Sequence, residues 1–194
     1  VEGMDIGPNN ELWVVTTDAN VALGGVGHFD GATWEYFTAA NSGLPAGATF
    51  KDIVVDDSNH VWIASDYGLI KYDGTDWTQF NTANSGLSSD NIYAVLADDQ
   101  NRIWALVGNA VDIFDGTAWT QINETDWPIS GFSGHSMDIR GDHVILAEGG
   151  NSRILMFDGT DWQTETVNFT IYDSFIDSEN NYWVSGYGVV GKFD

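Results

Sequence analysis

Three short polar segments of the chain gather oxygen atoms of the kind that bind divalent cations. They read DDSN, DDQN and DSENN, and each stands between two apolar stretches. Ca²⁺ prefers about six to eight oxygen ligands from Asp, Asn and backbone groups. None of the segments has the spacing of an EF-hand, and Asp and Asn also stabilise ordinary turns by accepting hydrogen bonds from nearby amides. Both interpretations stay open, and no other cofactor is expected. The candidate calcium ligands are Asp56, Asp57, Asp98, Asp99 and Asp177.

Aromatic, charged and imidazole side chains in the less regular segments form a second candidate site. Trp127 lies in the segment NETDWPISGFSGH, which departs from the pattern of the rest of the chain. An aromatic ring with Asp and Asn nearby could stack on a sugar and hydrogen-bond its hydroxyl groups. The alternative is that Trp127 fills a space between structural units. The candidate ligand-binding residues are Trp127, Tyr67, Asp66, Arg153, Tyr187 and His135.

The sequence contains none of the common catalytic signatures, so we expect a non-catalytic protein. There is no Gly-x-Ser-x-Gly elbow, no His-Glu-x-x-His, no phosphate-binding glycine loop and no dinucleotide fingerprint. The enzymatic alternative is a lyase or a glycan hydrolase in which His135 acts together with a carboxylate or a bound cation.

Composition and charge exclude several classes of partner. Six Lys and Arg stand against 29 Asp and Glu in 194 residues, which gives a net charge of −23. Such a surface repels phosphate backbones and anionic lipid headgroups, so neither nucleic acid nor membrane insertion is expected. No apolar run approaches the ~20 residues of a membrane-spanning helix. The absence of Cys excludes a disulfide framework and thiolate metal sites.

One phrase recurs through the chain and defines its organisation. It reads HFDG, KYDG, IFDG and MFDG, and the chain stops at KFD. The copies lie about 42 residues apart, which is the length of a propeller blade. Each unit contains an apolar segment, a polar turn, a Trp-containing strand, a second turn, a strand that ends in Asp-Gly, and a last strand opened by Trp. The predicted units span residues 1–48, 49–90, 91–133, 134–170 and 171–194.

Alternation of apolar and polar residues with Asp, Asn and Gly at the turns predicts antiparallel strands throughout. We therefore predict an all-β fold: a β-propeller of about five four-stranded antiparallel blades, the last one incomplete. Two repeated positions carry Trp, and we expect these rings to be buried between neighbouring blades. The eight residues are Trp13, Trp62, Trp104, Trp183, Trp34, Trp77, Trp119 and Trp162. The first unit also carries an insertion, TTDANVALGGVG, between its second and third strands.

Units such as DDSNHVWIASDYGLIKYDG followed by NSGLSSDNIYAVLADD resemble the two-component regulator propeller repeat. The second and third units match best, and the fourth departs because Ile145 replaces Trp and the Gly-Leu link is missing. The resemblance implies a periplasmic, cell-surface or secreted sensing region of a bacterial protein.

Two accounts of the incomplete last unit remain. The chain is either part of a larger propeller, whose remaining blades would cover its ends, or a five-bladed ring with one three-stranded blade. Exposed edge strands of an open array would also pair with another chain.

From these observations we predict a non-catalytic, extracytoplasmic module that binds a glycan, a small ligand or a protein. A structural or adhesion unit of a larger surface protein is a further alternative, beside the enzyme described above.

Overall fold

A computed structural model describes residues 1–16 and 25–193. These residues form five antiparallel sheets, and no helix is present among them. Sheet 1 contains β1 (Gly3–Ile6), β2 (Leu12–Thr16), β3 (Gly25–Phe29) and β4 (Trp34–Phe37). Sheet 2 contains β5 (Phe50–Val55), β6 (Val61–Ser65), β7 (Gly68–Tyr72) and β8 (Trp77–Phe80). Sheet 3 contains β9 (Ala94–Ala97), β10 (Ile103–Leu106), β11 (Ala110–Phe114) and β12 (Trp119–Asn123).

The two remaining sheets differ in strand number. Sheet 4 contains β13 (Ser136–Arg140), β14 (His143–Ala147), β15 (Arg153–Asp158) and β16 (Trp162–Thr166). Sheet 5 contains β17 (Ile171–Ile176), β18 (Tyr182–Gly186) and β19 (Val189–Phe193). In every sheet each strand pairs with the next one along the chain. The predicted all-β architecture of antiparallel meanders is thereby confirmed.

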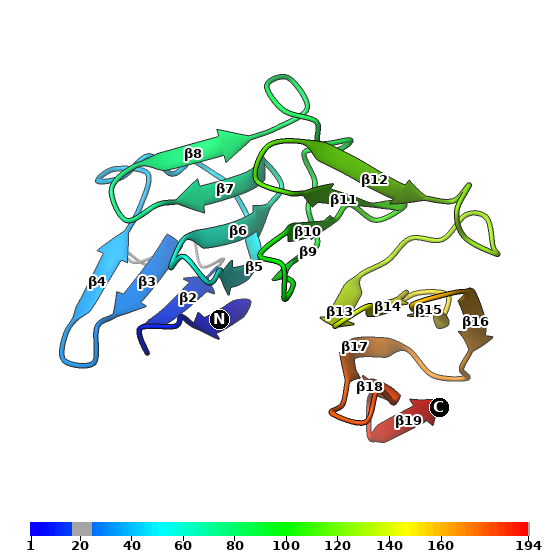
Figure 1. The fold of residues 1–194 in the computed structure, drawn as a ribbon. Coiled ribbons are helices and arrows are strands. Elements are labelled where there is room, and N and C mark those ends of the chain that lie inside the picture. Colours follow the sequence, from blue (N-terminus) through cyan, green and yellow to red (C-terminus); the bar gives the residue numbers. More distant parts are fainter. Residues whose placement is uncertain (17–24, 194) are drawn as a thin grey trace.

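The sheets are arranged side by side in an arc, with their first strands on the inside (Figure 1). Strand β1 packs against β5, β5 against β9, β9 against β13, and β13 against β17. The two ends of the chain lie apart from each other across the opening of the arc (Figure 1).

The recurring Asp-Gly forms the tight turn between the third and fourth strands. The Asp73 carboxylate accepts hydrogen bonds from the amides of Thr75 and Asp76 at 2.9 and 2.8 Å. Gly74 follows with φ of 96°, a backbone conformation that disfavours residues with a Cβ. The same pattern holds in sheets 1, 3 and 4, which explains why the phrase recurs.

The hydrophobic core is divided into four clusters, one between each pair of consecutive sheets. Trp13, Trp62 and Trp104 are buried in three of these clusters, as predicted. Burial is less complete at the remaining positions: Trp77, Trp119, Trp162 and Trp183 are only partly buried. The prediction is wrong for Trp34, whose residue surface is 44% exposed.

The links between sheets explain the different exposure of the fourth-strand Trp residues. A Cβ on Gly43 would lie 2.7 Å from the Cβ of Trp77, and one on Gly86 would lie 2.5 Å from that of Trp119. The glycines therefore let each link lie directly on the Trp of the following sheet. No link in the described chain precedes Trp34, so its ring stays exposed.

Trp127 lies in the link between sheets 3 and 4, where its side chain is buried. It is 6% exposed and belongs to the cluster between these sheets. Its ring meets the edges of Phe132 and Trp162 at centroid distances of 5.4 and 6.3 Å. The link lacks the Ser-Gly-Leu sequence, and the indole of Trp127 fills space between sheets 3 and 4. The alternative interpretation, a space-filling residue, describes its position.

Carboxylates join successive sheets along the inside of the arc. Because the first strand of each sheet is an edge strand, some of its amides have no partner within their own sheet. Asp5 accepts a hydrogen bond from the amide of Val55 at 2.7 Å, and Asp52 accepts one from that of Val95 at 2.9 Å. Asp138 does the same for Ile176 at 2.7 Å. These contacts connect sheets 1 to 2, 2 to 3 and 4 to 5.

Candidate functional site: the axial cavity

A cavity of about 320 Å³ opens on the inside of the arc, and all five sheets contribute to it. We call it the axial cavity. Glu2 precedes β1, and the other contributions come from the beginning of β5, β9, β13 and β17 or from the residue just before them. The side chains that carry its chemistry are Lys51, Asp52, Tyr93, His135, Tyr172 and Asp173.

Lys51 provides a positive charge in the axial cavity. Its Nζ donates a hydrogen bond to Oδ1 of Asn91 and lies 4.6 Å from the centroid of the Tyr93 ring. Partial burial lowers the pKa of Lys51, and the charge of Asp66 acts in the opposite direction. The amine is therefore held in a fixed place against an aromatic face, where it can donate to a ligand oxygen.

Asp52 and Asp173 provide acidic groups. Burial raises the pKa of Asp52 to about 6, against the effect of hydrogen bonds from the amides of Val95 and Ile53. The charges of Asp5 and Asp173 raise it further. Asp173 accepts a hydrogen bond from the Ser136 hydroxyl at 3.0 Å. A ligand hydroxyl or amine that donates to the Asp52 carboxylate would favour the ionised form of Asp52.

Aromatic and imidazole rings complete the axial cavity. Tyr172 is 58% exposed, so one side of its ring is available to a ligand. His135 is exposed and meets the edge of the Tyr93 ring at a centroid distance of 6.3 Å. Tyr93, His135 and Tyr172 also line a neighbouring cavity of about 360 Å³, which extends to Gly149 and Gly150. The two cavities adjoin at these three rings.

Of the residues predicted to bind a ligand, His135 lies in the axial cavity. Asp66 and Tyr67 form the turn between β6 and β7, where the Asp66 carboxylate accepts a hydrogen bond from the Thr49 amide at 2.7 Å. Tyr187 is exposed in the turn between β18 and β19. The structure does not bring these three residues to the axial cavity.

Arg153 holds the link between sheets 3 and 4 in place. Its guanidinium donates to both carboxylate oxygens of the buried Glu148, at 2.5 and 2.7 Å. It also donates to the backbone carbonyls of Ser130 and Gly131. The Glu148 carboxylate raises the pKa of Arg153. Arg153 thus positions the link, and its donors are engaged within the protein.

The predicted calcium ligands are divided among three sheets. Asp56, Asp98 and Asp177 each accept a hydrogen bond from the indole Nε1 of the Trp six residues later, at 2.9, 2.8 and 2.7 Å. Asp57 and Asp99 are exposed neighbours in the same turns. Among residues 1–16 and 25–193, no three His, Asp or Glu side chains are grouped as a metal site would require.

Asp98 and Asp177 each accept several hydrogen bonds, which affect their pKa values. Burial raises the pKa of Asp98, but hydrogen bonds from Trp104 and Arg102 outweigh it, so the pKa lies below its ordinary value. The pKa of Asp177 is lowered by hydrogen bonds from Asn181 and Trp183. The Asp residues of the polar turns therefore fix the Trp of the second strand, which accounts for their spacing.

Sequence reasoning missed five residues of the axial cavity: Lys51, Asp52, Tyr93, Tyr172 and Asp173. A signal was present, because FKDIVV and TIYDSF place charged residues inside otherwise apolar strands. The insertion predicted in the first unit falls mostly on residues 17–24, which lie outside the described residues.

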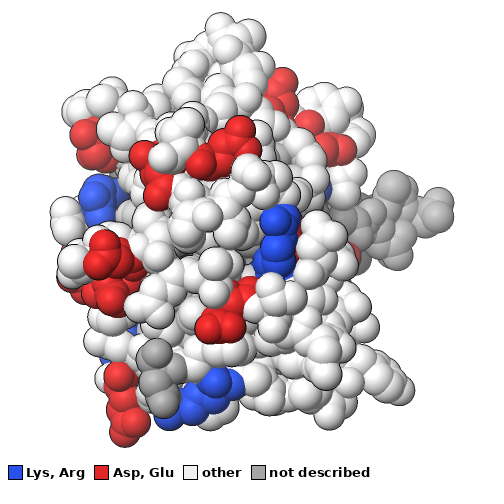
Figure 2. Space-filling view, turned by 90° about the vertical axis from the view of Figure 1, so that its right-hand side faces the viewer, with Lys and Arg blue, Asp and Glu red and all other residues white. Residues whose placement is uncertain are grey.

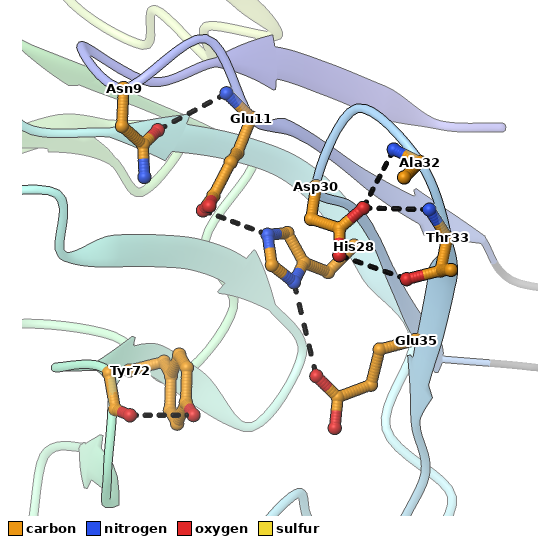
Figure 3. A network of polar contacts seen from close by, with 9 residues as sticks. Asn9, Glu11, His28, Asp30, Ala32, Thr33, Glu35 and Tyr72 are labelled. Carbon is orange, nitrogen blue, oxygen red and sulfur yellow. Dashed lines mark hydrogen bonds and ion pairs between the residues drawn. The ribbon is translucent and has the colours of Figure 1, made fainter.

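A second polar cluster lies between sheets 1 and 2, in a groove of about 270 Å³ that we call groove 1/2. His28 stands between two carboxylates in this groove (Figure 3). Its Nε2 lies 2.9 Å from Glu11, and its Nδ1 lies 3.9 Å from Glu35. The imidazole also stacks on Trp13 at a centroid distance of 4.1 Å. The polar groups of His28 and Glu11 thus engage one another.

The charged residues of the surface are mostly acidic. Figure 2 shows one side of the molecule, where Asp and Glu side chains lie in several separate groups among uncharged residues. Lys and Arg are fewer on this side (Figure 2), in agreement with the net charge of −23. A cationic ligand or partner is attracted to such a surface.

No protein-family model matches the sequence, and no curated protein is similar to it in sequence. Solved structures with the same fold are found. One is the extracellular domain of the hybrid two-component system BT3049 from B. thetaiotaomicron, with a TM-score of 0.78 and 13% identity. The whole chain is covered, but it spans only 28% of that structure. Within the described residues, no helix is long and apolar enough to cross a membrane.

Two further structures have other roles. Virginiamycin B lyase from Staphylococcus aureus, solved with quinupristin, has a TM-score of 0.73 and 12% identity over the whole chain and 69% of the lyase. YCF48 bound to D1 peptide has a TM-score of 0.68 and 12% identity, over 98% of this chain and 62% of YCF48. At these identities the likeness shows the fold alone. The fold is one that the extracellular domain of BT3049 also has, in agreement with the resemblance to the two-component regulator propeller repeat.

Proposed function

We propose that this chain is a non-catalytic, extracytoplasmic recognition module that binds a polar ligand of the glycan class in the axial cavity. The observation that carries the proposal is the composition of that cavity. Tyr172 presents a ring on which a sugar can stack, while Lys51, Asp52 and Asp173 supply hydrogen-bond donors and acceptors. The similarity to extracellular domains of two-component systems supports the sensing role and the location.

Binding to a glycan array, followed by calorimetric titration of each hit, tests this proposal. We expect saturable binding that Tyr172→Ala weakens by at least about tenfold, because the loss of a stacked ring costs on the order of 1.4 kcal/mol. Tyr187→Ala is the matched control, since Tyr187 is also exposed but lies outside the axial cavity. Glycan binding that is unchanged in Tyr172→Ala would place the site elsewhere.

A lyase is the second candidate, and His135 is the observation that favours it. The imidazole stands in the axial cavity together with Asp173, and the same fold occurs in virginiamycin B lyase. Incubation with candidate substrates and detection of products by mass spectrometry separates the two functions. Product formation that disappears in His135→Ala would establish the enzyme, and saturable binding without product supports the recognition module.

We further propose that the five sheets are consecutive blades of a propeller with additional blades. Met4 in β1 is 69% exposed, whereas its counterpart Ile53 in β5 is 4% exposed because sheet 1 covers it. A further blade on sheet 1 would bury Met4 in the same way. Class averages of the natural protein in electron micrographs test the ring, and a closed ring of five blades would refute this proposal.

A further inference from the structure

A groove of about 380 Å³ opens between sheets 3 and 4, away from the axial cavity, and we call it groove 3/4. It lies beside the turns between β13 and β14 and between β15 and β16. These turns are at the opposite end of the strands from His135, which precedes β13. Groove 3/4 is therefore separate from the site proposed above.

Groove 3/4 is lined mainly by apolar and aromatic side chains. Trp104 and Ile113 from sheet 3 are buried, and Phe157 and Trp162 from sheet 4 are partly buried. The rings of Phe157 and Trp162 lie close together, with a centroid distance of 5.1 Å. The volume and the flat walls suit a single fused aromatic ring system, because aromatic rings pack favourably edge to face and offset.

A side-chain contact that joins sheets 2 and 3 and sheets 4 and 5 is missing at groove 3/4. An Asn with positive φ ends the turn between the first and second strands of sheets 1, 2, 3 and 5. Asn101 of sheet 3 accepts a hydrogen bond from the amide of Asp57 in sheet 2 at 2.9 Å. Asn180 of sheet 5 lies 3.2 Å from the imidazole of His143 in sheet 4. Each of these contacts joins the turns of two neighbouring sheets.

Sheet 4 has Gly141 at this place, with φ of 60°. A Cβ on Gly141 would meet no atom within 4 Å, so the space beside the turn is empty of protein. Glycine cannot make the side-chain contact, and the turns of sheets 3 and 4 stay apart. Groove 1/2 is open although Asn59 stands in the turn of sheet 2, so Gly141 removes one contact at groove 3/4 without being the sole cause of its opening.

The charges around groove 3/4 indicate the ionic character of its ligand. Asp142 is exposed at the rim. The other charged residue of the lining, Arg102, donates from Nε to Asp98 at 2.6 Å, so its charge is balanced within sheet 3. The net charge of −23 also disfavours an anion and favours a cation. An ammonium group near Asp142 is the complementary partner.

We propose that groove 3/4 binds a small molecule with one fused aromatic ring system and one ammonium group. The ring lies between the side chains of the two sheets, and the ammonium pairs with Asp142. This proposal does not depend on the function of the axial cavity.

Titration with three indoles of different charge tests the proposal. Tryptamine is cationic, indole is neutral and indole-3-propionate is anionic at pH 7. We expect affinities that fall in this order, with about tenfold between tryptamine and indole at low salt, as for a charge pair of about 1.4 kcal/mol. Calorimetry and saturation-transfer NMR measure the three compounds. No binding of tryptamine, or equal binding of all three, would overturn the proposal.

Two variants locate the binding. Gly141→Asn introduces the residue that stands in the other turns, and Asn tolerates positive φ. We expect it to weaken tryptamine binding at least about tenfold by partly closing the groove. Gly188→Asn is the matched control, because Gly188 has φ of 68° and open space around it but lies in sheet 5. Equal effects of the two variants would contradict the location.

Asp142→Asn tests the ionic part separately. The side chain is exposed, so the variant should fold normally, and its melting temperature checks this. We expect tryptamine to bind this variant no more tightly than indole does, while the affinity for indole is unchanged. A preference for tryptamine that persists in Asp142→Asn would show that the ammonium does not pair with this residue.

Discussion

Groove 1/2 and groove 3/4 occupy the same place in the repeat, and one is polar while the other is apolar. The floor is common to both, because Trp13 and Trp104 are equivalent and both are buried. The residue paired with Trp differs: His28 is opposite Trp13, and Ile113 is opposite Trp104. Other equivalent pairs are Glu11 and Arg102, Glu35 and Thr120, Phe37 and Ile122, and Tyr72 and Phe157.

The difference between the grooves shows which positions the fold constrains. The Trp of the second strand must be large and apolar, because it fills the space between two sheets. The residue opposite it differs from sheet to sheet: it is His28 in sheet 1, Lys71 in sheet 2 and Ile113 in sheet 3. Binding properties can therefore change from one sheet boundary to the next without loss of the core.

The largest expected effect tests the common floor of the two grooves. Trp13→Ala and Trp104→Ala should each lower the free energy of unfolding by about 3–5 kcal/mol, because each leaves a large cavity between sheets. Trp34→Ala should lower the free energy of unfolding by less than about 1 kcal/mol, since 44% of that residue is exposed and no neighbouring sheet of the described chain packs on it. Urea denaturation measures all three. A loss at Trp34 as large as at Trp104 would contradict the packing described here.

A smaller effect separates the two grooves by pH. Asp98 accepts the indole hydrogen bond of Trp104, whereas Gly7 stands six residues before Trp13. The pKa of Asp98 is below its ordinary value in the folded state, so its contribution is complete above about pH 4 and is lost as the pH falls further. Asp98→Asn should lower the free energy of unfolding by on the order of 2 kcal/mol at pH 7. The difference in unfolding free energy between this variant and the wild type, measured by urea denaturation, should shrink between pH 4 and pH 2.

The exposed neighbour Asp99 provides the control for this measurement. Asp99→Asn changes the same charge in the same turn, but no indole donates to Asp99 in the described contacts. We expect a change below about 0.5 kcal/mol with little dependence on pH. If Asp98→Asn and Asp99→Asn had equal effects, the hydrogen bond to Trp104 would not stabilise the fold.

The smallest effect comes from exchanging the residues opposite Trp. Ile113→His places an imidazole beside Arg102, which stands where sheet 1 has Glu11, so the imidazole finds no carboxylate partner there. We expect this variant to lower the free energy of unfolding by about 1–2 kcal/mol. His28→Ile should change stability by less than about 1 kcal/mol, because the ion pair with Glu11 is partly exposed. Thermal denaturation detects both. A greater cost for His28→Ile would mean that groove 1/2 depends on its polar contacts.

The sequence sufficed to predict the strands and their order, because the Asp-Gly turns and the Trp strands recur at regular spacing. It also predicted the burial of Trp62, whose environment is repeated. It did not predict the axial cavity, since Lys51, Tyr93 and Tyr172 approach one another only when strands of different sheets are placed around one axis. For Trp127 the link sequence had no repeat counterpart, so only its contacts with Phe132 and Trp162 determine its role.

The carboxylates of Asp5, Asp52 and Asp138 give the row of sheets a direction. Each sheet that carries such a residue satisfies an amide of the sheet that follows it, and never of the one before. If one such unit were repeated in tandem, its carboxylate could form the same hydrogen bond to an amide of the copy that follows. Sheet 3 is the exception, because β9 contains no acidic residue. The boundary between sheets 3 and 4 therefore relies on other contacts, among them those that Arg153 makes with Glu148 and with the link.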